Sequence, residues 1–253
     1  MALIAVPLAA TRGWRQWRRL DRRGIAFALA GGVMLALHFW SWNASVSLTT
    51  VAASVVLVNL QPAIVGVLSA VWLRESPDQR QWLGIGIAML GALAVAGQDA
   101  RGLEGFAGSR ALLGDLLAVA GAIAAALYYL AGRRLRGTLD LWPYVALVYG
   151  ACLLTLLALV MITGVSLWPQ SSRELAIFAA LAAGPMMLGH TGMNWALRYL
   201  PAYVVNLTVL GEPIGATLLA AFLPGIREVP SALTMLGGAL VLGGILLALP
   251  RKR

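Results

Sequence analysis

Charged residues are scarce in this chain of 253 residues, of which 11% are charged and 60% are hydrophobic. Soluble domains carry about 25% charged residues, so this chain has too few to cover a water-facing surface of its size. The composition therefore excludes an ordinary soluble domain and predicts an all-α polytopic membrane protein. The net charge of +9 does not indicate nucleic-acid binding in this class, because loop arginines set the orientation of membrane proteins.

Groups that carry out chemistry or hold metals are also few. The single cysteine, Cys152, lies in an apolar run, so no disulfide can form within the chain and no zinc-type spacing exists. Two histidines without a nearby carboxylate pair or thiol make a poor metal site. The sequence has no GxxxxGK[ST] motif for ATP and no Ser/His/Asp set within its runs. We therefore expect neither an enzyme, nor a metal site, nor a cofactor.

Long apolar runs fill most of the chain. A transmembrane helix needs about 20 apolar residues, and eight runs approach or exceed that length. The first ten residues are apolar but too short to span. We therefore predict eight full transmembrane helices preceded by an N-terminal half-helix. The runs cover residues 24–48, 50–73, 82–97, 111–131, 142–164, 175–197, 202–223 and 231–249.

The distribution of arginine predicts the orientation. If the arginine-rich segment 11–23 lies inside the cell, 15 of the 19 lysines and arginines fall in inside segments and four in outside segments. Cytoplasmic loops of membrane proteins carry the excess of these residues. The sequence therefore predicts a multi-pass membrane protein whose C-terminus is cytoplasmic.

Two runs carry a polar residue followed by proline near their centres, Gln61-Pro62 and Glu212-Pro213. Proline has no N–H, so it leaves a backbone carbonyl free one turn earlier and predicts a helix kink at each place. Acidic side chains at this depth are costly and mark pathways or internal hydrogen-bonding sites. Glu212 is thus either a site for proton coupling or for a cationic substrate, or a protonated acid that hydrogen-bonds across helices.

An internal repeat relates the two polar-proline pairs. A shift of the chain by the 151 positions that separate Gln61 from Glu212 also aligns Asn43 with Asn194. The first copy of this block begins inside and the second outside, so the repeats are inverted in the membrane. Inverted repeats with a site at the midplane are a design of secondary transporters. The alternative is that apolar helices of similar composition align by chance.

The order of these motifs resembles the EamA repeat of the drug/metabolite transporter superfamily. The resemblance implies an inner-membrane carrier of ten helices in two inverted five-helix repeats, here at residues 1–98 and 111–250. Members of the family move small metabolites, amino acids or drugs, commonly outward. The residues that carry it are Asn59-Leu60-Gln61-Pro62, Leu73-Arg74-Glu75 and the glycine-rich run 82–97 in the first half, and Gly114-Asp115, Gly189-His190-Thr191, Asn194-Trp195, Gly211-Glu212-Pro213 and Arg227-Glu228 in the second.

The chain departs from the family pattern at its N-terminus. The eight runs match helices three to ten, the first ten residues match the end of helix two, and helix one is absent. In the family that helix helps to line the central cavity. We therefore expect that Met1 is a misplaced start or that the chain is a fragment. Upstream DNA without an in-frame hydrophobic segment would contradict this expectation.

The function implied by the resemblance is that of a secondary transporter. We expect an exporter of small organic metabolites, amino acids or drugs that works by alternating access. The alternative is a non-transporting remnant or assembly partner on the same membrane scaffold. The expected partners are the lipid bilayer and a small-molecule substrate, with the proton and a second copy of the chain as further candidates.

Polar and aromatic residues inside the runs are the candidates for the substrate cavity. Each also has a structural interpretation, since polar groups within spans need partners wherever they face and buried tryptophans serve in packing. The candidates are His38, Trp40, Asn43, Asn59, Gln61, Tyr128, His190, Asn194, Trp195 and Glu212, with helix kinks at Pro62 and Pro213.

Two further patterns are structural. Gly84, Ala88 and Gly91 share one helix face, as do Gly237 and Gly244, and small residues at this spacing allow close helix packing. We expect these faces to form a seam between the last helices of the two halves. Asp115 is expected to begin a helix, where an acidic group suits the helix dipole.

Overall fold

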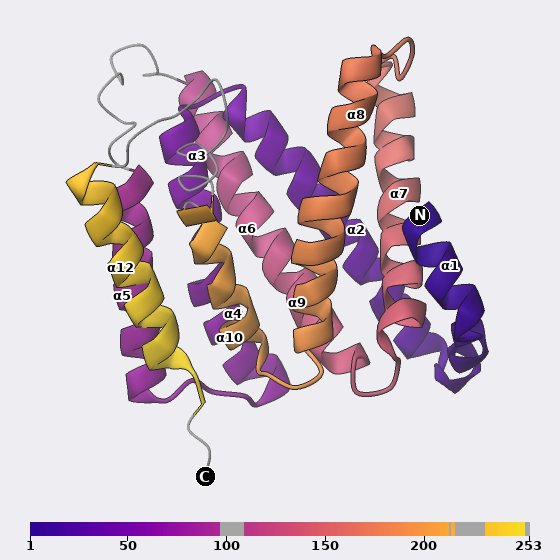
Figure 1. The fold of residues 1–253 in the computed structure, drawn as a ribbon, viewed down its shortest axis with the longest axis horizontal. Helices are drawn as coiled ribbons and strands as arrows, with labels where there is room; N and C mark the ends of the chain where they lie inside the picture. The colour runs from indigo at the N-terminus through magenta and orange to yellow at the C-terminus, as the bar shows by residue number, and fades with distance from the viewer. Residues whose placement is uncertain (97–108, 213, 216–230, 251–253) are drawn as a thin grey trace. The chain divides into compact units, whose positions relative to one another are not determined.

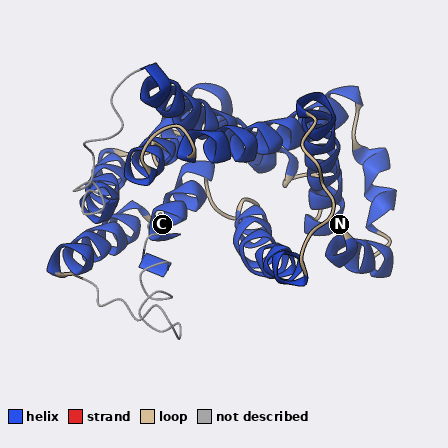
Figure 2. Ribbon diagram, turned by 90° about the horizontal axis from the view of Figure 1, so that it is seen from above, coloured by secondary structure: helices blue, strands red, loops and turns tan. Residues whose placement is uncertain are grey.

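The computed structural model describes residues 1–96, 109–212, 214–215 and 231–250. Every regular element in these residues is helical (Figures 1 and 2). Five helical segments among them are long and apolar enough to cross a membrane: Arg22–Val46, Ala53–Leu73, Arg110–Leu135, Leu141–Thr163 and Ser172–Ala196. The predicted all-helical, polytopic class is therefore confirmed, while the number of membrane helices and the inverted repeats stay predictions.

The chain divides into two compact units. Unit 1 is formed by Met1–Leu37 and Leu127–Pro201, and unit 2 by His38–Ala126 and Ala202–Arg253. Helices α2 (Arg22–Val46) and α6 (Ser109–Leu135) contribute residues to both units. Each unit thus combines a segment from the first half of the sequence with one from the second.

Unit 1 surrounds α7, the helix Leu141–Thr163. Its short helix α1 (Ala2–Ala10) packs against α7, as Figure 1 shows. A Cβ atom on Gly32 of α2 would lie 2.3 Å from the carbonyl oxygen of Val148, so α2 and α7 pack backbone to backbone. The remaining elements are the 3₁₀ helix η1 (Gly13–Arg19), α8 (Ser172–Leu181), the π-helix η4 (Ala182–His190) and α9 (Thr191–Ala196).

Three of the segments predicted to lie inside are joined by hydrogen bonds in unit 1. Asp140 accepts hydrogen bonds of 2.6 Å from both Gln16 and Arg198, which lie in different segments. Arg133 donates to the carbonyl oxygen of Leu197 at 2.8 Å. Segments on one side of a membrane can meet in this way, so the contacts agree with the sidedness predicted from arginine.

Unit 2 is built from shorter helices. In Figure 1, α12 (Ala232–Ala248) lies beside α5 (Gln79–Ala96), and α10 (Ala202–Leu207) lies beside α4 (Gln61–Leu68). The other elements are α3 (Val51–Val58), the π-helix η2 (Ser69–Leu73) and the 3₁₀ helix η5 (Thr208–Gly211).

The predicted glycine seam joins α5 to α12 and is confirmed. A Cβ atom on Gly84 would lie 2.6 Å from the carbonyl oxygen of Gly244, and one on Gly91 would lie 2.5 Å from that of Gly237. Real side chains do not reach such distances, so only glycine allows these backbones to meet. We call Gly84, Ala88, Gly91, Gly237 and Gly244 the glycine seam.

The expectation for Asp115 was wrong. Helix α6 begins at Ser109, so Asp115 lies well beyond its first turn and cannot interact with the helix dipole as an N-terminal acid. The apolar run predicted a start of this helix at residue 111, which is too late, because the polar residues 109 and 110 are also helical.

Three runs that were expected as single helices are interrupted, among them the run 202–223, in which the 3₁₀ helix η5 follows α10. The run 50–73 divides into α3 and α4, with Asn59 and Leu60 between them and Pro62 in the first turn of α4. The run 175–197 contains the π-helix η4 between α8 and α9. Pro213, the second predicted kink, lies outside the described residues.

Candidate functional site

Polar side chains converge in unit 1 at the junction of α6, α7 and α9. Tyr128 comes from α6, Tyr144 and Tyr149 from α7, and Thr191 and Asn194 from α9. All five side chains are buried. Because lipid offers no hydrogen bonds, polar groups within membrane spans must find partners inside the protein. We call these five residues the polar centre.

Asn194 is the hub of the polar centre. Its amide nitrogen lies within hydrogen-bonding reach of three acceptors that share its two N–H groups: the hydroxyl of Tyr128, that of Tyr149 at 3.2 Å and the carbonyl oxygen of His190 at 2.8 Å. The imidazole of His190 lies beside Tyr128, with 6.2 Å between the ring centroids. Of the predicted residues, the structure thus brings Tyr128, His190 and Asn194 together.

The π-helix η4 positions Thr191. The Thr191 hydroxyl donates to the carbonyl oxygen of Met186, five residues earlier, at 3.0 Å. That hydroxyl has one proton, so it accepts the hydrogen bond that joins it to Tyr149 at 3.1 Å. A π-helical segment inside a helix is often found at functional sites. Here the wider turn sets the register in which both Thr191 and Asn194 meet α7.

Two polar atoms of the polar centre have no hydrogen-bond partner within the described residues. They are Oδ1 of Asn194 and the hydroxyl of Tyr144, and both are buried. Both lie near Gly132, where packing is tight: a Cβ atom on Gly132 would lie 2.7 Å from Leu197 Cδ1, 2.9 Å from the Tyr144 hydroxyl and 3.5 Å from Asn194 Oδ1. An unsatisfied buried polar group costs about 1–3 kcal/mol, so a ligand that bonds to these atoms gains that energy.

Arg136 hydrogen-bonds to the backbone next to the polar centre. Its side chain is 2% exposed, and its Nε donates to the carbonyl oxygen of Asn194 at 2.9 Å. Another guanidinium nitrogen donates to the carbonyl oxygen of Leu139. The backbone of Asn194 is thereby fixed while its side-chain oxygen stays free to bind.

Unit 2 holds the predicted residues Gln61, Asn59 and His38 in buried positions. Asn206 of α10 donates to Gln61 of α4 at 3.4 Å, which is at the long limit for a hydrogen bond. His38 bonds through Nδ1 to the carbonyl oxygen of Gly121 at 3.0 Å. Asn59 lies at the break between α3 and α4 and lines a cavity.

The other predicted residues have exposed side chains. Trp40 and Asn43 are exposed on α2, and Asn43 donates to its own helix at the carbonyl oxygen of Phe39. Trp195 is exposed and packs on the ring of Tyr199. Glu212 is also exposed. None of these four joins the polar centre, and their role in a substrate cavity stays a prediction.

The sequence matches the description "EamA-like transporter family" over residues 1–97 and 112–249. The chain belongs to this family. The family is one of transporters, and the long apolar helices agree with a multi-pass membrane protein. A family of transporters also argues against an enzymatic activity.

Two known proteins are similar to this member of the EamA-like family. The "Uncharacterized transporter YetK" of Bacillus subtilis (strain 168) is 24% identical over 216 residues, which are 82% of this chain and 62% of that protein. The chain thus spans less than two thirds of this relative. A solved structure described only as "Crystal structure of protein" has a TM-score of 0.74 and 19% identity, and covers 97% of this chain and 82% of its own. That likeness concerns the fold alone.

Tyr144, Tyr149, Thr191 and Arg136 are not among the cavity residues predicted from the sequence. The tyrosines were ambiguous within an apolar run, and Arg136 belonged to a segment that served only to predict orientation. One signal was available: Thr191 and Asn194 are three residues apart and so share a helix face. The π-helix η4 turns this face toward α7, and no pattern in the sequence predicted that π-helix.

Proposed function

We propose that this EamA-like protein is a secondary transporter of small organic solutes, and that the polar centre binds a hydrogen-bonding group of the solute. The observation that carries the proposal is the pair of unpaired buried atoms, Asn194 Oδ1 and the Tyr144 hydroxyl. One atom can only accept a hydrogen bond, while the other can donate or accept. A solute hydroxyl, amine or amide can satisfy both. Buried tyrosine rings add apolar contact for the rest of the molecule.

We further propose that the carrier works by alternating access and exports its solute. The repeats 1–98 and 111–250 are inverted, and the C-terminus faces the cytoplasm of a cell bounded by this inner membrane. Interrupted helices support the proposal, since transporters place substrate sites at discontinuous membrane helices. The arginine distribution and the contacts among the inside segments support the orientation.

A single hydroxyl tests the binding role of the polar centre. Tyr144→Phe removes a buried hydroxyl that has no partner in the described residues, so we expect unchanged or slightly raised thermal stability. We expect export to fall about fivefold, as for the loss of one hydrogen bond worth about 1 kcal/mol. The measurement is efflux-dependent resistance to a panel of small organic compounds, followed by uptake into inverted vesicles.

Two tyrosine variants serve as controls. Tyr149→Phe removes a hydroxyl that accepts from Asn194 and bonds to Thr191, so it should lower stability as well as export. Tyr199→Phe changes an exposed tyrosine and should alter neither. The screen is run on the chain with and without a hydrophobic helix fused to its N-terminus. Export that is identical in wild type and Tyr144→Phe, in the form that transports, would contradict the assignment.

Proton coupling is a separate part of the proposal and rests on Glu212. Its repeat partner Gln61 can make the same hydrogen bonds but cannot titrate, so the acid is the asymmetric addition. Glu212→Gln should remove the pH dependence of export while leaving binding intact. Transport with the wild-type pH profile in this variant would exclude coupling at Glu212.

A further inference from the structure

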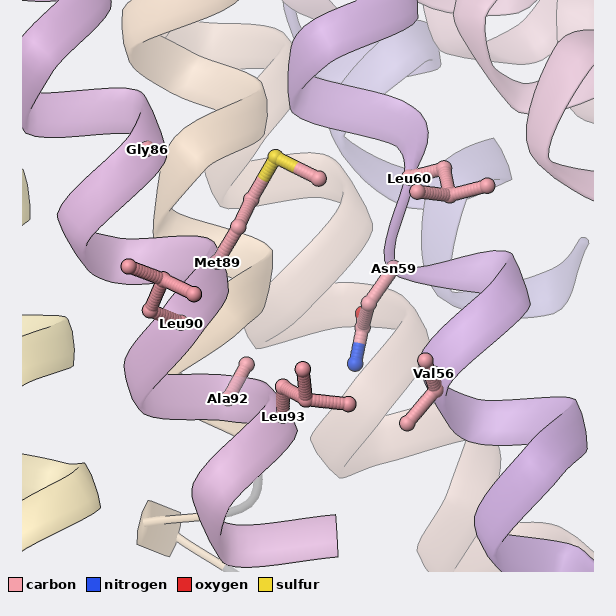
Figure 3. A pocket seen from close by; sticks show the side chains of 8 residues that line it. All are labelled: Val56, Asn59, Leu60, Gly86, Met89, Leu90, Ala92 and Leu93. Atoms are coloured by element: carbon pink, nitrogen blue, oxygen red, sulfur yellow. The ribbon is translucent and has the colours of Figure 1, made fainter. Parts of the chain in front are cut away.

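A cavity in unit 2 lies beside the break between α3 and α4 (Figure 3). Its volume is about 370 Å³, within the range of about 300–1,000 Å³ that is usual for small-molecule sites. Val56, Asn59 and Leu60 line it on one side, and Met89, Leu90 and Leu93 of α5 on the other. Apart from Asn59, every lining side chain is apolar. The cavity is separate from the polar centre, whose residues all belong to unit 1.

The amide of Asn59 is the feature that makes this cavity a binding site. The side chain is 8% exposed, and the described residues give it no hydrogen bond. In Figure 3 it projects from the break between α3 and α4 toward α5, near Val56 and Leu93. Its backbone is fixed, since its N–H donates to the carbonyl oxygen of Val55 at 3.0 Å. A buried amide without a partner costs about 1–3 kcal/mol, and a ligand that bonds to it recovers that cost.

The chemistry of the walls defines the ligand. Among the described residues no charged side chain lines the cavity, and an ion placed against apolar walls would lose its hydration without compensation. An amide can both donate and accept, so a hydroxyl, carbonyl or amide group suits it equally. We infer that this cavity binds a neutral amphipathic molecule whose single hydrogen-bonding group meets Asn59 and whose apolar body lies against Met89 and Leu93. This inference does not depend on transport through the polar centre.

Such a molecule has two sources in a membrane. A hydrophobic solute can enter from the bilayer, or a phospholipid can place an ester carbonyl at Asn59 and an acyl chain in the cavity. Both share the same chemistry of one neutral polar group on an apolar body. The experiment therefore has one arm for each source.

Photolabelling with a diazirine derivative of 1-octanol tests the inference on the full chain in phosphatidylcholine nanodiscs. We expect labelled peptides to concentrate at Val56, Met89 and Leu93. Met89→Trp fills the cavity and should abolish this labelling, whereas Leu83→Trp, at an exposed position of α5 outside the cavity, should preserve it. Asn59→Leu should weaken labelling by the alcohol about fivefold, as for one lost hydrogen bond. It should not weaken labelling by a diazirine hydrocarbon without the hydroxyl.

Competition and native mass spectrometry distinguish the two sources. Displacement of the label by 1-octanol supports a solute site. A phospholipid that stays bound to the wild type and is lost from Met89→Trp, but not from Leu83→Trp, supports a lipid site. Labelling spread evenly along α5 and unchanged by Met89→Trp, with equal lipid retention in all variants, would overturn the inference. Correct folding of each variant is checked by size-exclusion chromatography before labelling.

Discussion

The two compact units hold their helices together by different means. Unit 1 joins α6, α7 and α9 through a buried hydrogen-bonded network around Asn194, while unit 2 joins α5 to α12 through a face of glycines. In lipid, helices gain no hydrophobic energy by meeting, so association depends on close packing and on hydrogen bonds. Each unit also uses the other interaction: Gly32 lets α2 meet α7 in unit 1, and Gln81 of α5 donates to the carbonyl oxygen of Ala248 of α12 at 3.3 Å in unit 2.

The difference separates structural contacts from contacts that can serve a solute. In the glycine seam the backbones of α5 and α12 touch. In the polar centre two buried atoms keep unused hydrogen-bonding capacity. If the contact served stability alone, replacing these two unpaired polar atoms with apolar atoms would make the protein more stable. Buried polar atoms without a partner in the described residues also occur in unit 2, at Trp42, Ser69, Asp115 and Asn206. The polar centre differs in that its two such atoms lie close to one another, beside Gly132.

Repeat-related positions differ in the same way. Asn43 is exposed and bonds only to its own helix in the described structure, whereas its partner Asn194 is buried and networked. Gln61 is buried in the first turn of α4, whereas its partner Glu212 follows the 3₁₀ helix η5, next to Pro213, which lies outside the described residues. An equal register in the sequence thus corresponds to unequal environments. The predictions below test whether these environments decide the role of each residue.

The largest effect is expected at the glycine seam. Gly244→Leu would place a side chain against the backbone of Gly84, where a Cβ atom alone would lie 2.5 Å from the carbonyl oxygen. Overpacking of this kind costs about 3 kcal/mol, and here neither backbone can move aside without separating the helices. We expect most of the protein to aggregate, which is measured by size-exclusion chromatography of detergent-solubilised membranes.

The adjacent glycine provides the control. A Cβ atom on Gly243 meets nothing within 4 Å, so Gly243→Leu adds the same side chain to the same helix without a clash. It should leave the folded yield close to that of the wild type. If both variants aggregate to the same extent, helix propensity or hydrophobicity is responsible, and the seam does not hold the two helices together.

A smaller but still large effect is expected at the polar centre. Asn194→Leu removes three hydrogen bonds at once and leaves the hydroxyls of Tyr128 and Tyr149 without this donor. Hydrogen bonds between membrane helices contribute about 1–2 kcal/mol at most, so we expect a loss of about 2 kcal/mol. Thermal unfolding in detergent measures it. Asn43→Leu, the repeat-related change, should alter stability by less than about 0.5 kcal/mol.

The sequence predicted the class of fold because hydrophobicity follows lipid contact directly. It also predicted the glycine seam, since small residues at helical spacing have one common purpose in membrane helices. It did not predict the π-helix η4 or the break at Asn59. Both features depend on which backbone carbonyl loses its helical hydrogen bond to a polar side chain or a proline. They depend also on the neighbouring group that then hydrogen-bonds to that carbonyl. Tertiary contacts settle that choice.

Site residues were only partly predictable for the same reason. Asn194, Tyr128 and His190 stood out as polar or aromatic residues within apolar runs, and they lie together. Trp40 and Trp195 stood out equally and have exposed side chains. Periodicity places a residue on a helix face but does not say what that face meets. Tyr144, whose hydroxyl is buried and unpaired in the described residues, could be recognised only from its neighbours.

The hydrogen bond between Gln61 and Asn206 offers a weaker test of polar contacts, now within unit 2. At 3.4 Å it is long, although both side chains are buried. Interhelical pairs in membranes couple by about 0.6 kcal/mol on average, and this one should not exceed that value. A double-mutant cycle of Gln61→Leu and Asn206→Leu, followed by thermal unfolding, measures the coupling. A coupling above about 2 kcal/mol would show that unit 2 also depends on a polar network.

The smallest effect is expected for Asp140 at the base of unit 1. Hydrogen bonds from Gln16 and from Arg198 hold the pKa of its carboxyl below the usual value. The charged form is therefore favoured in the folded protein, and its contribution is complete above the unfolded pKa of about 3.9. That contribution is lost as the pH falls through the lowered folded pKa. Asp140 and Arg198 are largely exposed, with relative side-chain exposures of 56% and 42%, so solvent limits the gain to a few tenths of a kcal/mol.

Asp140→Asn should accordingly lower the unfolding temperature slightly at pH 7, and the difference from the wild type should shrink below about pH 4. High salt should also shrink it, because exposed charges are screened. The variant Arg198→Ala in a double-mutant cycle isolates the ion pair from the hydrogen bond of Gln16. A difference that persists unchanged at low pH and in high salt would mean that Asp140 acts by its shape at the start of α7. The inside segments would then be joined by packing, as α5 and α12 are, and the distinction between the two units would be smaller than their structures indicate.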